Sequence, residues 1–215
     1  MQKELINKIL EKKEVFSKGK RGIIYTSTID NKTYLIKQRN PKSKSPGTIQ
    51  NEFEYNQKLN KIKIGPKIYY YDKKQDFLIR DFVKGKKIED WVKENKQTKD
   101  FKQNLIKILK QILLQCKKLD EIKINKQELT NPHKDILITN QNKPTIIDFE
   151  RCRHTLKPKN VTQFMQYLTR PFMKKTLGLQ DINLDKKQII ELSEKYKKNQ
   201  TKENFTFLLK IISQT

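Results

Sequence analysis

The chain has 215 residues, with 48 Lys or Arg against 24 Asp or Glu, so its formal net charge is +24. This length allows one good-sized core or two small lobes. Two cysteines exclude a disulfide framework, and without a signal peptide or long apolar run we expect a cytoplasmic protein with no membrane partner. The charge suits RNA or an acidic partner, but lysines spread along the whole chain also fit a coding bias.

The chain opens with apolar residues at helical spacing in residues 5–10, which predicts a short amphipathic helix. Next, Gly19 and Gly22 lie between apolar β-type residues and predict a hairpin turn. In protein kinases a glycine-rich turn of this kind cradles nucleotide phosphates with its backbone N–H groups. Lys18, Gly19 and Gly22 are therefore candidate phosphate-binding residues, although the pattern is incomplete and an ordinary hairpin turn explains it equally well.

A strand over 33–37 ends in Lys37, as does the kinase strand whose Lys holds the α- and β-phosphates. Helical periodicity over 49–59 predicts a following helix, and a Glu there pairs with that Lys in kinases. We choose Glu52, because Glu54 projects roughly 200° away around the helix. The alternative is that Glu52 faces solvent.

Two further strands are predicted over 64–72 and 76–85. The second would run into the connection between two lobes, where backbone groups near Asp81 and Val83 could hold an adenine edge by hydrogen bonds. Trp91 follows on a short helix starting near residue 88, and we interpret it as a core residue rather than a base-stacking one.

The second half of the chain is mostly helical by periodicity. Apolar stripes predict helices over 101–119, 161–168 and 205–212, and Cys116 lies on the first stripe as a small core residue. We therefore expect an α+β fold, with an antiparallel sheet and one helix in residues 1–83 and a small, mostly helical lobe in residues 84–215.

The loop over 126–138 has the order of a kinase catalytic loop. The pair Glu128-Leu129 corresponds to its acid-Leu pair, which makes Glu128 a candidate base for the substrate hydroxyl. Asp135 precedes three apolar residues and takes the position of the metal-binding Asn. The interval between the two acids is two residues longer than in the usual pattern, and the preceding His and Arg or Gly are replaced by Lys126 and Gln127.

The stretch 144–152 predicts a buried strand that ends in Asp148-Phe149-Glu150, which resembles the Asp-Phe-Gly motif with Glu in place of Gly. A turn at 140–143 would bring Asp148 and Asp135 into one neighbourhood. Two such carboxylates repel each other unless a cation lies between them, which favours Mg²⁺ or Mn²⁺.

The order of these segments resembles an archaeal family of small, atypical serine/threonine protein kinases related to the RIO kinases and to the kinases linked to tRNA modification. The resemblance implies a two-lobed kinase-like fold with ATP and a divalent metal between the lobes. It further implies that Lys37 and Glu52 position phosphates, that Asp135 and Asp148 hold metal and that Glu128 is the base. It extends over about residues 15 to 170, and the segments that carry it are 128–134, 148–152 and 158–164.

The chain departs from ordinary kinases after Glu150, because no A-P-E motif and no large helical subdomain for peptide substrates follow. The leading hypothesis is phosphoryl transfer to a Ser/Thr hydroxyl of a folded protein. The alternatives are an ATPase in ribosome or tRNA assembly, a nucleotide-binding pseudokinase, and a basic RNA-binding protein. A basic strip that could contact an acidic protein or RNA consists of Arg151, Arg153, Lys157 and Lys159.

Overall fold

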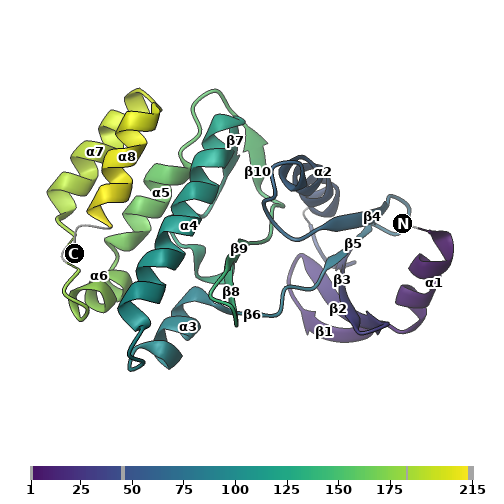
Figure 1. Ribbon diagram of the computed structural model, residues 1–215. Coiled ribbons are helices and arrows are strands. Elements are labelled where there is room, and N and C mark those ends of the chain that lie inside the picture. The colour runs from purple at the N-terminus through teal and green to yellow at the C-terminus, as the bar shows by residue number, and fades with distance from the viewer. Residues whose placement is uncertain (1, 45–46, 183, 213–215) are drawn as a thin grey trace. The chain divides into compact units, whose positions relative to one another are not determined.

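The computed structural model describes residues 2–44, 47–182 and 184–212, which form an α+β protein (Figure 1). The chain divides into two compact units. Unit 1 comprises Met1–Val83 and Ile147–Cys152, and unit 2 comprises Lys84–Ile146 and Arg153–Thr215. The segment that carries the Asp-Phe-Glu motif thus clusters with unit 1, whereas the sequence analysis assigns it to the second lobe. None of the helices in the described ranges combines the length and the apolar character needed to cross a membrane.

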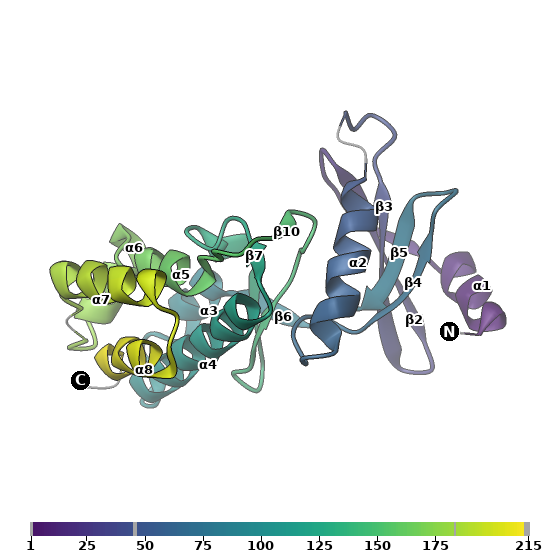
Figure 2. The same cartoon turned by 90° about the horizontal axis from the view of Figure 1, so that it is seen from above.

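Unit 1 contains a five-stranded antiparallel sheet in the order β1-β2-β3-β5-β4. Two helices accompany it, and Figure 2 shows them on opposite faces of the sheet. The hairpins, the first helix and the helix over 49–59 are confirmed. The elements are α1 (Lys3–Glu11), β1 (Glu14–Lys18), β2 (Gly22–Ile29), β3 (Lys32–Arg39), α2 (Thr48–Asn60), β4 (Ile68–Asp72) and β5 (Phe77–Asp81).

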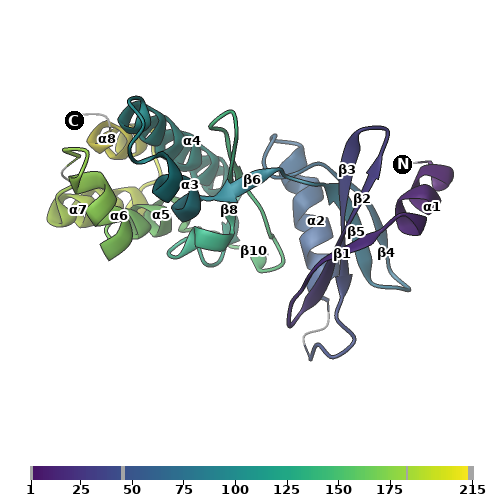
Figure 3. The same ribbon diagram turned by 90° about the horizontal axis from the view of Figure 1, so that it is seen from below.

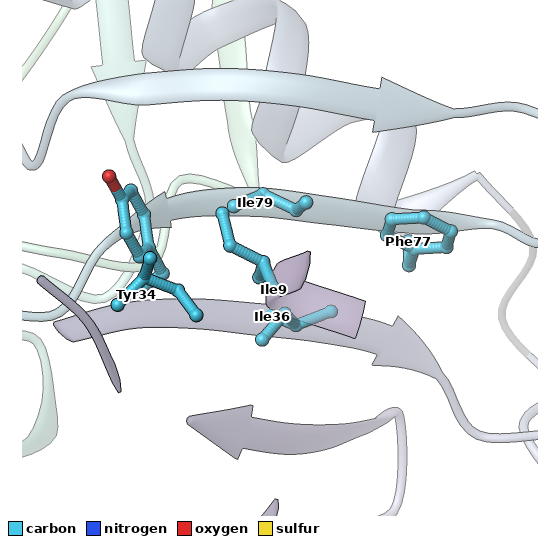
Figure 4. Close-up of a cluster of buried hydrophobic side chains, with 6 residues drawn as sticks. Ile9, Tyr34, Ile36, Phe77 and Ile79 are labelled. Atoms are coloured by element: carbon cyan, nitrogen blue, oxygen red, sulfur yellow. The ribbon is translucent and has the colours of Figure 1, made fainter. Parts of the chain in front are cut away.

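The alternation of side chains along β3 and β5 divides the sheet into an apolar face and a mixed face. Tyr34 and Ile36 of β3 point to the first face, where they pack with Phe77 and Ile79 of β5 and with Ile9 of α1 (Figure 4). Ile9, Ile36 and Ile79 have no solvent exposure. The amphipathic helix α1 therefore closes this side of the sheet.

The alternate residues on β3, which include Leu35 and Lys37, point to the face covered by α2. Helix α2 buries Ile49, Glu52, Asn56 and Leu59 at intervals of three and four residues. Its buried stripe is therefore half polar. A period of two on the strand and 3.6 on the helix thus brings Lys37 and Glu52 to one interface.

Unit 2 is built around α4, which packs on α5 and carries a small sheet in the order β6-β8-β9 at one side (Figures 1 and 3). The core positions expected for Trp91 and Cys116 are confirmed, since both are buried. The elements are β6 (Gly85–Lys87), α3 (Ile88–Asn95), α4 (Phe101–Glu121), β7 (Ile124–Lys126), η1 (Pro132–Lys134), β8 (Ile136–Thr139), β9 (Pro144–Ile146), β10 (Cys152–His154), α5 (Asn160–Leu168), α6 (Pro171–Gly178), α7 (Lys186–Lys198) and α8 (Lys202–Ile211).

The sequence analysis does not anticipate α6 and α7. Helix α7 buries only Ile189 and Tyr196 along 13 residues, so its apolar stripe is too sparse to stand out from the polar sequence around it. The strand expected within 144–152 ends before Asp148, because β9 stops at Ile146.

Candidate functional site

The ammonium group of Lys37 is buried in unit 1 and contacts three carboxylates. Its Nζ lies 2.6 Å from Glu52 Oε2, 2.9 Å from Glu150 Oε2 and 3.1 Å from Asp148 Oδ1. Lys37 is 7% exposed and Glu52 is completely buried. An ion pair at this depth is costly unless it is well bonded, which makes this cluster the candidate functional site of unit 1.

The structure separates the two glutamates of α2 as the helical geometry requires. Glu52 faces the sheet and bonds Lys37, whereas Glu54 is exposed and accepts a hydrogen bond from Gln50. The second oxygen of Glu52 lies 3.7 Å from Arg80 Nε, which is too long for a hydrogen bond. Glu52 is thus held mainly by Lys37.

Asp148 reaches this cluster through an unusual backbone conformation. Its φ of +62° lies in the left-handed region, which is uncommon for residues other than glycine and is often found at functional sites. The next residue, Phe149, is completely buried and packs against Gly65. The buried ring anchors the segment, while the Asp148 side chain keeps 41% of its surface exposed.

Glu150 is a site residue that the sequence analysis missed. Its two carboxylate oxygens bond two different cations, since Oε2 accepts from Lys37 and Oε1 accepts from Arg21 at 2.8 Å. The Asn51 side chain donates to the backbone oxygen of Glu150 at 2.8 Å and to that of Cys152 at 3.1 Å, which fixes the segment to α2. The only sequence signal is an acid at the position where the kinase motif has glycine.

The electrostatics of the cluster keep Lys37 charged. Burial by itself would lower the pKa of Lys37, but the charges of Glu52, Asp148 and Glu150 outweigh it, and the net pKa is raised. Burial lowers the pKa of the Arg80 guanidinium, and the charges of Glu52, Asp148 and Asp81 oppose this effect. Among the described residues, the three carboxylates can bring ligand oxygens within 4.8 Å of one another.

This donor set fits a divalent cation together with a polyphosphate. Hard cations such as Mg²⁺ prefer carboxylate oxygens, and Asp148 and Glu150 offer them next to Lys37 and Arg21, which suit phosphate oxygens. These four residues all belong to unit 1.

The glycine turn between β1 and β2 is closed by its own hydrogen bonds. The Gly19 N–H donates to Gly22 O at 2.9 Å, and the Gly19 carbonyl accepts from Asn40 Nδ2 at 2.8 Å. Gly22 borders Lys37, because a Cβ added to it would lie 3.5 Å from Lys37 Cε. Lys18 is exposed at the end of β1. The turn therefore brings Gly22 and Arg21 to the Lys37 cluster, and the Gly19 N–H is already bonded within the turn.

The two residues expected at an adenine edge differ in their backbone bonding. The Asp81 N–H donates to Lys67 O at 2.9 Å, and its carbonyl accepts from Arg80 at 3.2 Å. Its side chain accepts from Tyr69 and pairs with Lys32. Within the described chain, Val83 keeps backbone groups that no other residue uses.

In unit 2, the predicted catalytic loop contains a second buried ion pair. Lys126 Nζ lies 2.9 Å from Asp135 Oδ2, and the two residues are 1% and 8% exposed. Glu128 is exposed and has a φ of +79°, while its neighbour Leu129 is completely buried. Asp135 and Glu128 belong to unit 2 and Asp148 to unit 1, so a shared metal site for the two aspartates stays a prediction.

A network centred on Asp120 fixes the start of this loop. Both Asp120 oxygens accept hydrogen bonds, from Asn160 N, Asn160 Nδ2, Val161 N and Tyr196 OH. Asn160 also bonds the backbone at both ends of β7, accepting from Lys126 N and donating to Ile124 O. Burial raises the pKa of Asp120, and the hydrogen bonds from Asn160, Val161 and Tyr196 oppose this rise.

Comparison of the chain with models of known protein families and with curated proteins found no match.

Proposed function

We propose that the chain is a minimal, kinase-like enzyme that binds ATP with Mg²⁺ or Mn²⁺ and transfers a phosphoryl group to a Ser or Thr hydroxyl of a folded protein. This is the function that the resemblance to small, RIO-like atypical kinases predicts. The observation that carries the proposal is the Lys37–Glu52 ion pair at 2.6 Å with Asp148 Oδ1 at 3.1 Å from the same ammonium.

These three residues come from separate segments and supply the kinds of group that phosphoryl transfer uses. Glu52 orients Lys37, and Lys37 neutralises phosphate charge. Asp148, which is partly exposed, offers an oxygen ligand for the divalent cation. A structural ion pair would need only one carboxylate for one lysine, whereas here three converge on Lys37.

The resemblance to small atypical kinases assigns the remaining roles to residues of unit 2. Glu128, exposed on a left-handed backbone, accepts the proton of the acceptor hydroxyl, and Asp135 provides a further metal ligand. ATP supplies the phosphoryl group, whose bond to the bridging oxygen breaks as the bond to the hydroxyl oxygen forms. The positively charged ammonium of Lys126 pairs with Asp135 and thereby lowers the repulsion between Asp135 and Glu128 in the loop.

The test measures nucleotide binding, phosphate release and label transfer from γ-labelled ATP, in Mg²⁺ and in Mn²⁺. We expect wild-type protein to bind ATP, and Lys37→Ala and Asp148→Ala to weaken binding or abolish transfer. Glu52→Gln should reduce transfer by about tenfold or more, because Lys37 loses its orienting charge. Glu54→Gln is the matched control, since it changes the same residue type on the exposed face of the same helix.

The outcomes separate the candidate functions. Label on protein that is lost in Asp148→Ala and in Glu128→Gln supports the kinase, and free phosphate alone, lost in the same variants, indicates an ATPase that serves an RNA or ribosome assembly step. The absence of nucleotide binding in the wild-type protein contradicts the proposed nucleotide site.

A specific observation favours the pseudokinase as the second candidate. Asp135 is 8% exposed and is already paired with Lys126, which suits a structural role as well as a metal ligand. In a pseudokinase, wild-type protein binds ATP but neither transfers nor releases phosphate. Lys126→Met then changes only stability, whereas in an active enzyme it also changes the metal dependence of turnover.

A further inference from the structure

The Glu150 carboxylate connects two cations from different segments of unit 1. Arg21 precedes β2 in the glycine turn, and Lys37 lies near the end of β3. Each of the two Glu150 oxygens bonds one of these cations, at 2.8 and 2.9 Å, and the side chain is only 9% exposed. The carboxylate is therefore a well-bonded counter-ion for both cations rather than a surface acid.

An anion that presents two oxygens to two separate cations has the same binding chemistry as a phosphate group. Lys and Arg bind carboxylate and phosphate oxygens by the same charge-assisted hydrogen bonds. A phosphate placed on Lys37 and Arg21 would need the positions that the Glu150 oxygens occupy. Glu150 and a nucleotide phosphate are thus expected to compete for the same two cations.

The segment is built so that the Glu150 side chain can move while its backbone stays in place. Asn51 of α2 holds the Glu150 backbone oxygen, and the buried Phe149 ring anchors the residue before it. Three side-chain torsions separate the carboxylate from this backbone, and in the described part of the chain only the bonds to Lys37 and Arg21 hold its oxygens. Its oxygens lie near those of Asp148 in the acidic cluster, so a divalent cation on Asp148 would offer the displaced carboxylate a new partner.

We propose that Glu150 is a displaceable counter-ion, which pairs with Lys37 and Arg21 when no nucleotide is bound and releases them to nucleotide phosphates while turning toward the divalent cation. This inference rests on the proposed function. It makes Glu150 a positioning residue that couples nucleotide affinity to the metal. Without metal, the nucleotide competes with Glu150 and meets its negative charge.

The experiment compares ATP affinity by calorimetry at constant ionic strength, with EDTA and with Mg²⁺, for wild-type protein and Glu150→Gln. In EDTA we expect Glu150→Gln to bind ATP about tenfold more tightly than wild type, since one charge-assisted hydrogen bond is worth about this factor. In Mg²⁺ the advantage should shrink or reverse, because an amide is a poorer metal ligand than a carboxylate. Glu54→Gln is the control for a general change in charge.

A double-mutant comparison separates release of the cations from simple loss of negative charge. If Glu150 pairs with Arg21 when no nucleotide is bound, the gain in ATP affinity from Glu150→Gln should be smaller in an Arg21→Gln background. A Lys20→Gln background should leave this gain in affinity unchanged. Glu150→Asp provides a second variant with the charge retained. Its shorter side chain cannot bridge both cations, so ATP should also bind this variant more tightly than wild type in EDTA.

Two results would overturn the inference, and they differ in what else they affect. Equal ATP affinities of wild type and Glu150→Gln in both conditions would refute the counter-ion role and leave the proposed nucleotide site standing. No binding by either protein in either condition would refute both.

Discussion

Gly65 shows how a single residue supports the arrangement of the Lys37 cluster. Its φ is +76°, and a Cβ added there would lie 2.5 Å from Phe149 Cε2 and 2.9 Å from Phe149 Cζ. Real Cβ atoms do not approach this closely, so any side chain at residue 65 would displace the Phe149 ring. Because Asp148 and Glu150 flank this ring in the sequence, their positions depend on a glycine in another part of unit 1.

We predict that Gly65→Ala destabilises unit 1 by about 2–4 kcal/mol, combining left-handed backbone strain with overpacking. It should also weaken ATP binding, because Asp148 shifts with the ring. Gly47→Ala is the matched control, since Gly47 has a φ of +73° but nothing lies within 4 Å of an added Cβ. It should lose only about 1 kcal/mol. Urea denaturation measures both, and equal losses would contradict the role of the Phe149 contact.

At the scale of elements, the helices of unit 2 are joined by a polar centre rather than by apolar packing alone. Asp120 near the end of α4 accepts hydrogen bonds from the first residues of α5 and from Tyr196 of α7. Asn160 extends the network to β7, which precedes the Glu128 loop. The network therefore ties three helices to the loop that carries the candidate base.

We predict that Asp120→Asn lowers the free energy of unfolding by about 1–3 kcal/mol, because an amide cannot accept from all four donors. Asp100→Asn is the control, since Asp100 is an exposed acid before the first residue of α4. Chemical denaturation monitored by circular dichroism measures the loss. A loss no larger than that of the control would contradict the central role of Asp120.

The same residue also gives a pH dependence with a definite sign. Since burial raises the pKa of Asp120 in the folded state, the stability that it contributes is fully present below its unfolded pKa of about 3.9 and is lost as the pH rises through the folded pKa. We expect the stability difference between wild type and Asp120→Asn to be larger at pH 4 than at pH 7. An increase of this difference with pH would contradict the raised pKa.

At the scale of the molecule, the positive charge has no single location. Basic side chains outnumber acidic ones by about two to one in both units. Four lysines line a hollow at the end of α2 in unit 1, but other lysines are exposed all along α7 in unit 2. This distribution favours a general compositional bias over one dedicated RNA surface.

We predict that RNA binding is weak, falls steeply with salt and depends on the number of charges rather than on their place. Replacing four lysines by Ser at the α2 hollow, or four on α7, should weaken RNA binding equally, as measured by fluorescence anisotropy at several salt concentrations. Lys37→Ala should have no effect, because Lys37 is buried. A loss confined to one set would instead identify a local RNA interface. The set at the α2 hollow is Lys58, Lys61, Lys63 and Lys67, and the set on α7 is Lys186, Lys187, Lys197 and Lys198.

The sequence predicts those elements in which many apolar residues recur at the spacing of a helix or strand. The stripe of α4 buries nine residues, which makes its period of 3.6 easy to recognise, whereas the two buried positions of α7 leave no visible pattern. For the site, the kinase pattern paired Lys37 with a Glu of the following helix, and the ion pair between Lys37 and Glu52 agrees with this pairing. Helix geometry then separated Glu52 from Glu54, because the two project about 200° apart around the helix.

By itself, then, the sequence determined the α+β class, most of the elements and the strand and helix faces that carry Lys37 and Glu52. Only the tertiary structure decided that residues 147–152 cluster with unit 1 and that Glu150 bridges Lys37 and Arg21. The reason is physical, since periodicity reports which face of an element is buried but not which distant charges meet there. Contacts such as Arg21–Glu150, 129 residues apart, arise from the packing of the whole unit.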